Sequence, residues 1–293
     1  NGSVRGGAGF ESGAIGSQAG LGPVVIGKDL IAGLGGRSGL IVAQSGDPEG
    51  GAISPTIESV VIRGSILGKP ATGTPLSFNN FSGAIVAEGE ISSVVVDGDV
   101  VGGDIELTGI IYGYSSVNNV TVRGHLKGGL GDSSGQISAR EALNNVVIDK
   151  DIVGGDGFES GSVLSFGSLA KVTVGGSVLG GVGSQSGEIA LRSINESGAG
   201  DVGTVTVKGV VTGGFGNRSG QIASTGRIAE INVGGLLGGQ GLTSGSINVS
   251  GNIGTIEVDG NVEGGIGDRS GSILTFQNLG ALLVKGSVIG GSG

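Results

Sequence analysis

The sequence repeats itself, and the repeat limits the fold more than any other feature of the chain. Each copy contains the phrase GGxGxxSGx[IV] or a close variant, in which the serine is a convenient marker. The marker positions are Ser12, Ser38, Ser82, Thr108, Ser134, Ser160, Ser186, Ser219, Ser244 and Ser270. Their separations are 26, 44, 26, 26, 26, 26, 33, 25 and 26 residues. The period is therefore 26, and three enlarged loops and one single-residue deletion explain the exceptions.

A second pattern, [ILV]xx[VIL]x[VI]xGx[VIL]xGG, lies between these phrases, and Leu169, Val172, Val174 and Val178 fill it in one copy. Side chains alternate between the two faces of a strand, so Val172 and Val174 point to the same side. A glycine then turns the chain, Val178 lies in a second short strand, and Ile189 begins a third. Helical periodicity is absent, and each of the 69 glycines would cost a helix about 1 kcal/mol relative to alanine.

Three short strands separated by glycine corners and repeated every 26 residues describe one coil of a parallel β-helix, or β-solenoid. We expect an all-β fold of about ten coils with three strands in each, wound in the right-handed sense usual for parallel connections. Coils about 4.8 Å apart would form a rod on the order of 50 Å long. One buried column should contain Val60, Val94, Val120, Val146, Val172, Val205, Ile231, Ile256 and Leu282.

One outward column is predicted to alternate in charge. Arg63, Asp97, Arg123 and Asp149 follow the inward strand pair in consecutive coils, so stacking places each beside its opposite. Exposed opposite pairs contribute about 0.2–1 kcal/mol each, whereas like charges would repel. The marker serines should likewise form a hydroxyl stack, and the glycine after each should lie at a corner that needs positive φ.

The whole chain, residues 1–293, is interpreted as one continuous solenoid with loop insertions near 43–55, 69–81 and 193–201. All three insertions are rich in turn-forming residues. Loops on a rigid scaffold are where binding sites often occur, although tolerated drift in loop length is the simpler interpretation.

The acidic composition restricts the partners. A net charge of −9 argues against a nucleic-acid or anionic-membrane partner, because either would require clustered lysine and arginine. No run approaches the roughly 18 consecutive apolar residues of a membrane helix, so we expect no membrane insertion. The absence of cysteine fits a secreted protein without disulfides and also many cytosolic proteins.

No cofactor, metal or catalytic site is expected from the glycine-rich phrases. They superficially resemble the calcium-binding nonapeptide GGxGxD, but they recur every 26 residues instead of every nine, and the sixth position varies widely in chemistry. Calcium at the corners of Asp132 or Asp268 has no ligand cluster to support it. GxGxxG matches lack the strand, helix and acidic residue of a dinucleotide site. His125, the only histidine, is interpreted as a solvated turn residue.

Parallel β-helices include polysaccharide lyases and hydrolases, which makes a carbohydrate-binding or polysaccharide-degrading protein the alternative function. Aromatic residues are few, and the carboxylates are scattered around the corners. An ice-binding plane would need a uniform threonine column, which is absent. The outward middle column is apolar in its first half, at Val25, Val61, Val95 and Val147, which favours lateral packing against another rod.

Six Asn-x-Ser/Thr sequons are present, where chance would supply about two or three, so the chain has candidate glycan acceptors. Asn119 and Asn217 are chosen as the best candidates because both are expected at corners of the coil.

The chain resembles, in period and in phrases such as GSVLGGVGSQSGEI, the glycine-rich β-solenoid repeat regions of large bacterial surface proteins, including filamentous adhesins and autotransporter-like passengers. The resemblance covers nearly all residues and implies an extracellular or cell-surface location, a structural or adhesive role, and no enzymatic activity. Both termini lie at the same phase of the repeat without a capping element. We expect a segment of an extracellular fibre, adhesin stalk or surface layer that assembles end to end, because uncapped coils leave strand edges open.

Overall fold

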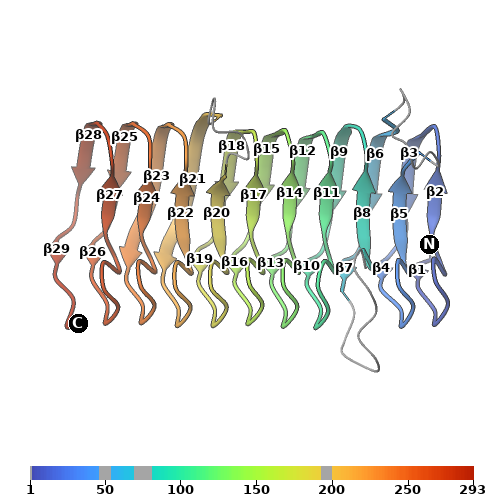
Figure 1. The fold of residues 1–293 in the computed structure, drawn as a ribbon, viewed down its shortest axis with the longest axis horizontal. Helices are drawn as coiled ribbons and strands as arrows, with labels where there is room; N and C mark the ends of the chain where they lie inside the picture. Colours follow the sequence, from blue (N-terminus) through green and yellow to red (C-terminus); the bar gives the residue numbers. More distant parts are fainter. Residues whose placement is uncertain (1, 46–53, 69–80, 193–199) are drawn as a thin grey trace.

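The computed structural model of the chain describes residues 2–45, 54–68, 81–192 and 200–293, and none of these forms a helix. Every strand pair within them is parallel, as in Val146↔Val172 of two successive coils. The coils lie side by side along the long axis, with the two termini at opposite ends (Figure 1). The predicted all-β parallel solenoid is therefore confirmed, while its right-handed sense stays a prediction.

Each coil contributes three strands. The first is the longest and forms one face of the rod: β3 (Gly20–Ile26), β6 (Thr56–Ile62), β9 (Ile91–Val96), β12 (Ser116–Val122), β15 (Ala142–Ile148), β18 (Ser168–Val174), β25 (Ile253–Val258) and β28 (Leu279–Val284). The second has two residues: β1 (Val4–Arg5), β4 (Leu30–Ile31), β7 (Ile66–Leu67), β10 (Val100–Val101), β13 (Leu126–Lys127), β16 (Ile152–Val153), β19 (Val178–Leu179), β26 (Val262–Glu263) and β29 (Val288–Ile289). Two strands span both positions: β21 (Val202–Thr212) and β23 (Ile228–Leu237).

The third strand follows the glycine-rich loop. Within the described residues, ten such strands form one parallel sheet, here called the third sheet: β2 (Ile15–Ser17), β5 (Leu40–Ala43), β8 (Ala84–Ala87), β11 (Ile111–Gly113), β14 (Ile137–Ala139), β17 (Val163–Ser165), β20 (Glu188–Leu191), β22 (Gln221–Ser224), β24 (Ile247–Val249) and β27 (Ile273–Thr275).

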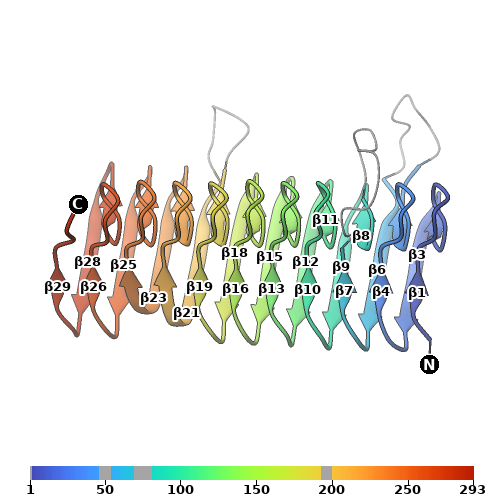
Figure 2. The same ribbon diagram turned by 90° about the horizontal axis from the view of Figure 1, so that it is seen from below.

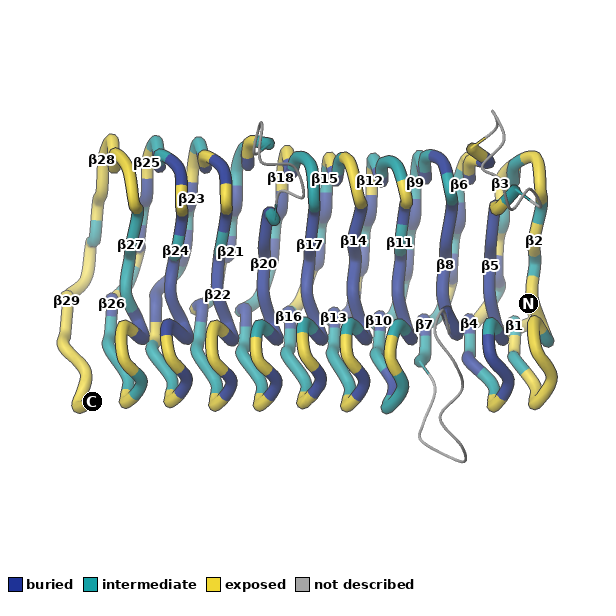
Figure 3. The backbone as a smooth tube through the Cα atoms, in the orientation of Figure 1, coloured by how far each residue is buried: buried dark blue, intermediate teal, exposed yellow. Residues whose placement is uncertain are grey.

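The register of the predicted column is confirmed, and the column is buried from Val60 to Ile256, whereas Leu282 is 46% exposed. Val60 pairs with Val94, and the pairing continues coil by coil to Leu282. Together with inward residues of the other two faces, such as Val178 and Ile189, the buried members of the column form one continuous aliphatic core. The exposed and buried segments alternate along each coil in Figure 3. The inward side chains of the three strands pack together, so each coil encloses an apolar interior.

The register survives every change of coil length. Ile41 pairs with Ile85 across 44 residues, and Leu169 pairs with Val202 across 33. The insertions predicted near 43–55, 69–81 and 193–201 lie largely outside the described residues. The single-residue deletion is absorbed by a register shift after Val207, where β21 has one residue more than β23. Such a bulge changes the backbone locally and leaves the neighbouring ladder intact.

The glycine-rich loops line up along one edge of the rod (Figure 2). Each loop is closed by its marker serine. Ser160 Oγ accepts a hydrogen bond from Gly155 N–H at 3.0 Å and donates one to Gly157 O at 2.8 Å. The marker residues do stack, as the bridge between Ser82 and Thr108 indicates, but most of their hydroxyls bond within their own coil and not along the stack.

Two backbone requirements explain the glycines of the loop. The glycine after the marker serine has positive φ, as predicted; Gly161, for example, has φ of 62°. The other glycines pack backbone on backbone between coils: a Cβ at Gly157 would lie 2.1 Å from Gly131 O, and one at Gly183 would lie 2.1 Å from Gly157 O. Any side chain there would force neighbouring coils apart, so the close stacking of loops requires glycine.

Candidate functional site

The alternating charges predicted on the outer surface are only partly brought together. Asp97 lies between two arginines, with its carboxylate oxygens 3.4 Å from Arg63 Nη1 and 2.7 Å from Arg123 Nη1. Asp149 is exposed in the next coil, and no ion pair joins it to Arg123, although the structure describes both. The same column continues to Asp259, whose carboxylate lies 2.7 Å from Lys285 Nζ. Because these groups are exposed, they define register more than they add stability.

The two candidate glycan acceptors differ in setting. Asn217 lies in the turn of a glycine-rich loop, is exposed, and accepts a hydrogen bond from Leu242 N–H at 3.0 Å. The expectation that Asn119 lies at a corner is wrong, because it lies inside β12, paired with Ser93 and Asn145. The segment 116–122 forms a strand because Val117, Val120 and Val122 fill the core. Asn119 is nevertheless exposed on the outer face.

His125 belongs to a ladder of side chains that bind backbone N–H groups of the next coil. His125 N–H donates to Asp99 Oδ1 at 2.8 Å, Asp151 N–H donates to His125 Nδ1 at 3.3 Å, and Ser177 N–H donates to Asp151 Oδ1 at 2.8 Å. The residue is therefore half-buried and structural, and the interpretation of His125 as a simply solvated residue was wrong. The ladder satisfies backbone donors at the corner before the second strand.

The pKa of Asp99 in this ladder is lowered. Burial raises the pKa of Asp99, but hydrogen bonds from Lys127 Nζ and His125 N–H outweigh burial and leave the pKa below its ordinary value. The Lys127 contact is 2.8 Å long. Donors to a carboxylate favour its charged form, so Asp99 remains an acceptor well into the acid range.

A groove opens on the outer face of the third sheet, between that sheet and the glycine-rich loops. Its volume is about 270 Å³. The lining comes from four consecutive coils: Phe81, Leu107, Tyr112, Tyr114, Ser133, Gln136, Ser138, Glu159, Leu164 and Phe166. Tyr112, Ser138 and Leu164 are stacked partners in β11, β14 and β17. Their 26-residue spacing is visible in the sequence, but the small number of aromatic residues gives no indication that several of them gather in one groove.

Aromatic rings gather at one end of this groove. Tyr112 stacks on Phe81 with ring centroids 6.0 Å apart, and meets Tyr114 edge to face at 4.7 Å. Tyr112 and Tyr114 are the only tyrosines of the chain. Burial raises the pKa of both phenols, so they remain neutral hydrogen-bonding groups across the physiological range. Tyr114 keeps 37% of its surface exposed, so one aromatic group is available to a ligand.

The other end of the groove is polar. Gln136 Nε2 donates to Ser162 Oγ at 3.1 Å, and Ser162 Oγ donates to Glu159 O at 2.6 Å. Ser138 is 1% exposed, and its hydroxyl has no hydrogen-bond partner. Most buried polar groups in proteins are satisfied, so such a hydroxyl requires an explanation.

A buried ion pair lies beside this polar end. Arg192 donates to Glu188 Oε2 at 2.8 Å and to Glu159 Oε1. Glu188 is 2% exposed in β20. Burial raises the pKa of Glu188 well above its ordinary value, an effect that nearby Arg218 opposes, while burial lowers the pKa of Arg192 to about 10. Arg192 therefore remains charged at neutral pH and neutralises Glu159 at the edge of the groove.

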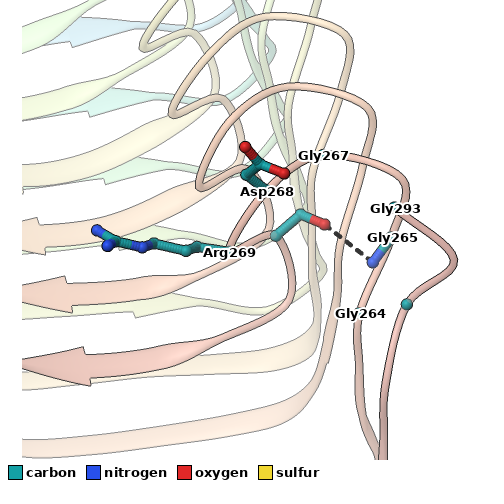
Figure 4. Close-up of a pocket in the computed structure, with 8 residues that line it drawn as sticks. Gly264, Gly265, Gly267, Asp268, Arg269 and Gly293 are labelled. Atoms are coloured by element: carbon teal, nitrogen blue, oxygen red, sulfur yellow. Dashed lines mark hydrogen bonds between the residues drawn. The ribbon is translucent and has the colours of Figure 1, made fainter.

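A second hollow, of about 360 Å³, lies at the last coil (Figure 4). It is lined almost entirely by backbone, with Gly264, Gly265, Gly267 and Gly293 around it, while the Arg269 side chain extends away from it. In this loop Gly265 N–H donates to the marker Ser270 at 2.9 Å. Interior coils have the next glycine-rich loop in this position, so the hollow is a consequence of coil stacking.

Neither a metal-ligand cluster nor a membrane-spanning helix is found in the described residues. No three His, Cys, Asp or Glu side chains there gather closely enough to hold a metal ion. The same residues contain no helix with the length and apolar character needed to cross a membrane.

No family model, no curated protein and no solved structure matches this chain. The architecture is an all-parallel β-solenoid with regularly spaced strands.

Proposed function

We propose that this protein is a structural rod, a segment of an extracellular fibre, adhesin stalk or surface layer, and that its terminal coils assemble end to end. The observation that carries the proposal is the stacking of one coil on the next. Leu282 pairs with Ile256 of the preceding coil in the same parallel register that joins Ile256 to Ile231 in the interior. The face of a coil can therefore bind another coil of the same kind through backbone hydrogen bonds.

The N-terminal coil is the complementary partner in this proposal. Val4, Ile15, Leu21 and Val24 are only partly buried there and continue the columns of the core. Docking one copy's first coil on another copy's last coil would extend every ladder by the contact that already joins neighbouring coils. Such a head-to-tail contact does not close on itself, and therefore produces filaments.

The surface location rests on a different argument. The resemblance to glycine-rich repeat regions of large bacterial surface proteins, including filamentous adhesins and autotransporter-like passengers, supports export, as does the exposed sequon at Asn217. The proposal includes no catalytic activity, since it draws only on packing.

Lateral contact between rods is a further part of the proposal. The outward column that contains Val25 is strongly exposed only at that first residue, because Val61, Val95 and Val147 are half-buried. A longer apolar ridge follows the glycine-rich loops, where the following residues are exposed: Phe10, Leu34, Leu130, Phe158, Val182, Phe215, Leu242 and Ile266. This ridge presents one large apolar side chain in most coils, which supports bundling along the loop edge.

Sedimentation velocity and electron microscopy over a concentration series test the end-to-end assembly. The wild-type protein should form rods that lengthen with concentration. Leu282→Asp should abolish lengthening, because it places a charge on the open core column. Phe215→Asp is the matched control, at an exposed apolar residue of an interior coil, and this variant should still lengthen end to end. A wild-type protein of one length at every concentration would contradict the proposal.

A further inference from the structure

The groove on the outer face of the third sheet has features of a ligand site that a structural rod does not need. Its lining combines the two tyrosines of the chain with Phe81 and Phe166, although aromatic residues make up only 3% of the sequence. At the position of Tyr112, the two flanking strands of the third sheet carry Val86 and Ser138. An aromatic cluster that leaves Tyr114 exposed offers a flat apolar surface to a partner.

The unpartnered hydroxyl of Ser138 is the second, independent observation. This atom is buried and lines the groove, yet no protein group bonds to it. Leaving a buried polar group unsatisfied destabilises the protein, and a bound ligand that carries hydroxyl groups would remove the penalty. Ser133 and Gln136 line the same end and add further hydrogen-bonding groups.

The charge around the groove indicates a neutral ligand. Glu159 is the only charged residue in the lining, and Arg192 already pairs with it. In the small adjoining hollow that shares Phe81 and Tyr114, Arg37 Nε lies 2.9 Å from Glu11 Oε1 and Glu88 Oε2 accepts from Ser45 Oγ at 2.7 Å. Arg140 and Glu88 act on Tyr114 with opposite charges, so the groove carries little net charge and an ion would gain little from binding here.

The shape of the groove indicates an elongated ligand. Lining residues run from Phe81 to Phe166 across four consecutive coils, which at about 4.8 Å per coil corresponds to about 14 Å along the rod. Beyond Tyr114 the adjoining hollow continues the depression. A chain of sugar rings matches this site, because each ring has an apolar C–H face for an aromatic side chain and hydroxyls at its edge.

We propose that the groove lined by Tyr112, Tyr114, Ser138 and Phe166 binds a neutral oligosaccharide. Tyr114 and Phe166 contact sugar ring faces, and the Ser138 hydroxyl exchanges hydrogen bonds with a sugar hydroxyl. The inference is independent of end-to-end assembly, because the groove lies in the middle of the rod. Oligosaccharide binding in the groove would make one side of the rod adhesive.

Tyrosine fluorescence tests this directly, because the chain contains no tryptophan and both tyrosines lie in the groove. The full chain is titrated separately with cellohexaose, maltohexaose and laminarihexaose, which differ in linkage, and with oligogalacturonate as an acidic probe. A saturable change in tyrosine emission with at least one neutral hexaose is expected. No response to any of the three, or a tighter response to oligogalacturonate, overturns the proposal.

Ser138→Ala separates binding from folding. The hydroxyl has no partner in the protein, so its removal should leave the thermal midpoint unchanged or raise it. The Kd for the hexaose should rise about fivefold, because one hydrogen bond to the ligand is lost. Ser184→Ala, at an exposed serine of a neighbouring glycine-rich loop, should change neither quantity. A Ser138→Ala protein with wild-type Kd would overturn the assignment of the groove.

Discussion

The residue before nine of the ten markers has a left-handed backbone although it is not glycine. In the described residues this position has φ between 50° and 59°, at Glu11, Arg37, Leu107, Ser133, Glu159, Gln185, Arg218, Thr243 and Arg269. Such a conformation costs an L-residue roughly 1–2 kcal/mol, and it persists because the glycine-rich loop around it is held by the next coil. The position matters for the site, since Leu107, Ser133 and Glu159 line the groove.

Among these residues, Thr243 is the one least suited to a left-handed backbone. It is β-branched at φ of 51°, and its buried hydroxyl has no partner. Thr243→Gly should therefore raise the free energy of unfolding by about 1 kcal/mol, as measured by urea denaturation. Thr255→Gly, in the ordinary extended backbone of β25, should lower it by about 1 kcal/mol. A destabilised Thr243→Gly protein would show that side-chain packing outweighs backbone strain at this position.

The buried carboxyl of Glu188 makes stability depend on pH. Burial raises its pKa in the folded protein above the ordinary 4.5, so folding favours the protonated form. The stabilisation from this group is complete below pH 4.5 and is lost as the pH rises through the folded-state value.

Glu188→Gln should remove this loss, because glutamine is neutral at every pH and Gln221 already occupies the paired position in the next coil. The variant should gain stability relative to wild type as the pH rises from 4.5 to 8, as measured by urea midpoints. Glu58→Gln, at an exposed carboxylate of β6, is the control for the overall loss of one charge. Parallel wild-type and Glu188→Gln curves would contradict the argument.

At the scale of the strand, the alternation of two faces determines which substitutions matter. In β15, Ile148 is fully buried, whereas its neighbour Val147 points outward and is half-buried. Both residues pair with strands on either side, so they share the same backbone ladder. The comparison isolates side-chain burial from hydrogen bonding.

Ile148→Ala should lower the free energy of unfolding by about 2–5 kcal/mol, because it leaves a cavity between two stacked aliphatic side chains. Val147→Ala should change it by no more than about 0.5 kcal/mol. Denaturation of the two variants in parallel measures both effects. Equal losses would mean that the outward face is covered in solution, as lateral packing of rods would do.

At the scale of the molecule, each coil contacts chiefly its two neighbours, so a whole coil is a removable unit. Deletion of residues 142–167 joins Glu141 to Ser168, which occupies the position of Ala142 one coil later. The shortened chain should fold with an unchanged far-UV circular dichroism spectrum per residue. Small-angle scattering should find a rod shorter by about 4.8 Å.

Deletion of half that length provides the contrast. Removing residues 142–154 breaks the period, so aliphatic side chains would face glycine corners in the next coil. This protein should unfold or aggregate. If it folds as well as the full-coil deletion, stacking in register is not what holds the rod together.

Much of the architecture could be predicted from the sequence. The 26-residue spacing of Val146 and Val172 is enough to stack them, because a solenoid brings equivalent residues of successive coils together. The same logic placed Arg63 beside Asp97 and required positive φ after each marker serine. It failed at Asn119, where a strand extends further than its apolar pattern suggested.

The period and the alternation of aliphatic residues thus determined the coil, its three strands and its core, because these depend on contacts that recur at fixed spacing. The groove was decided by the tertiary structure alone. Tyr114, Ser138 and Phe166 line one groove because each glycine-rich loop turns through a left-handed residue before its marker, and the varied residues at that position do not reveal this turn in the sequence. Whether an outward side chain is exposed, covered or part of a site depends on that path.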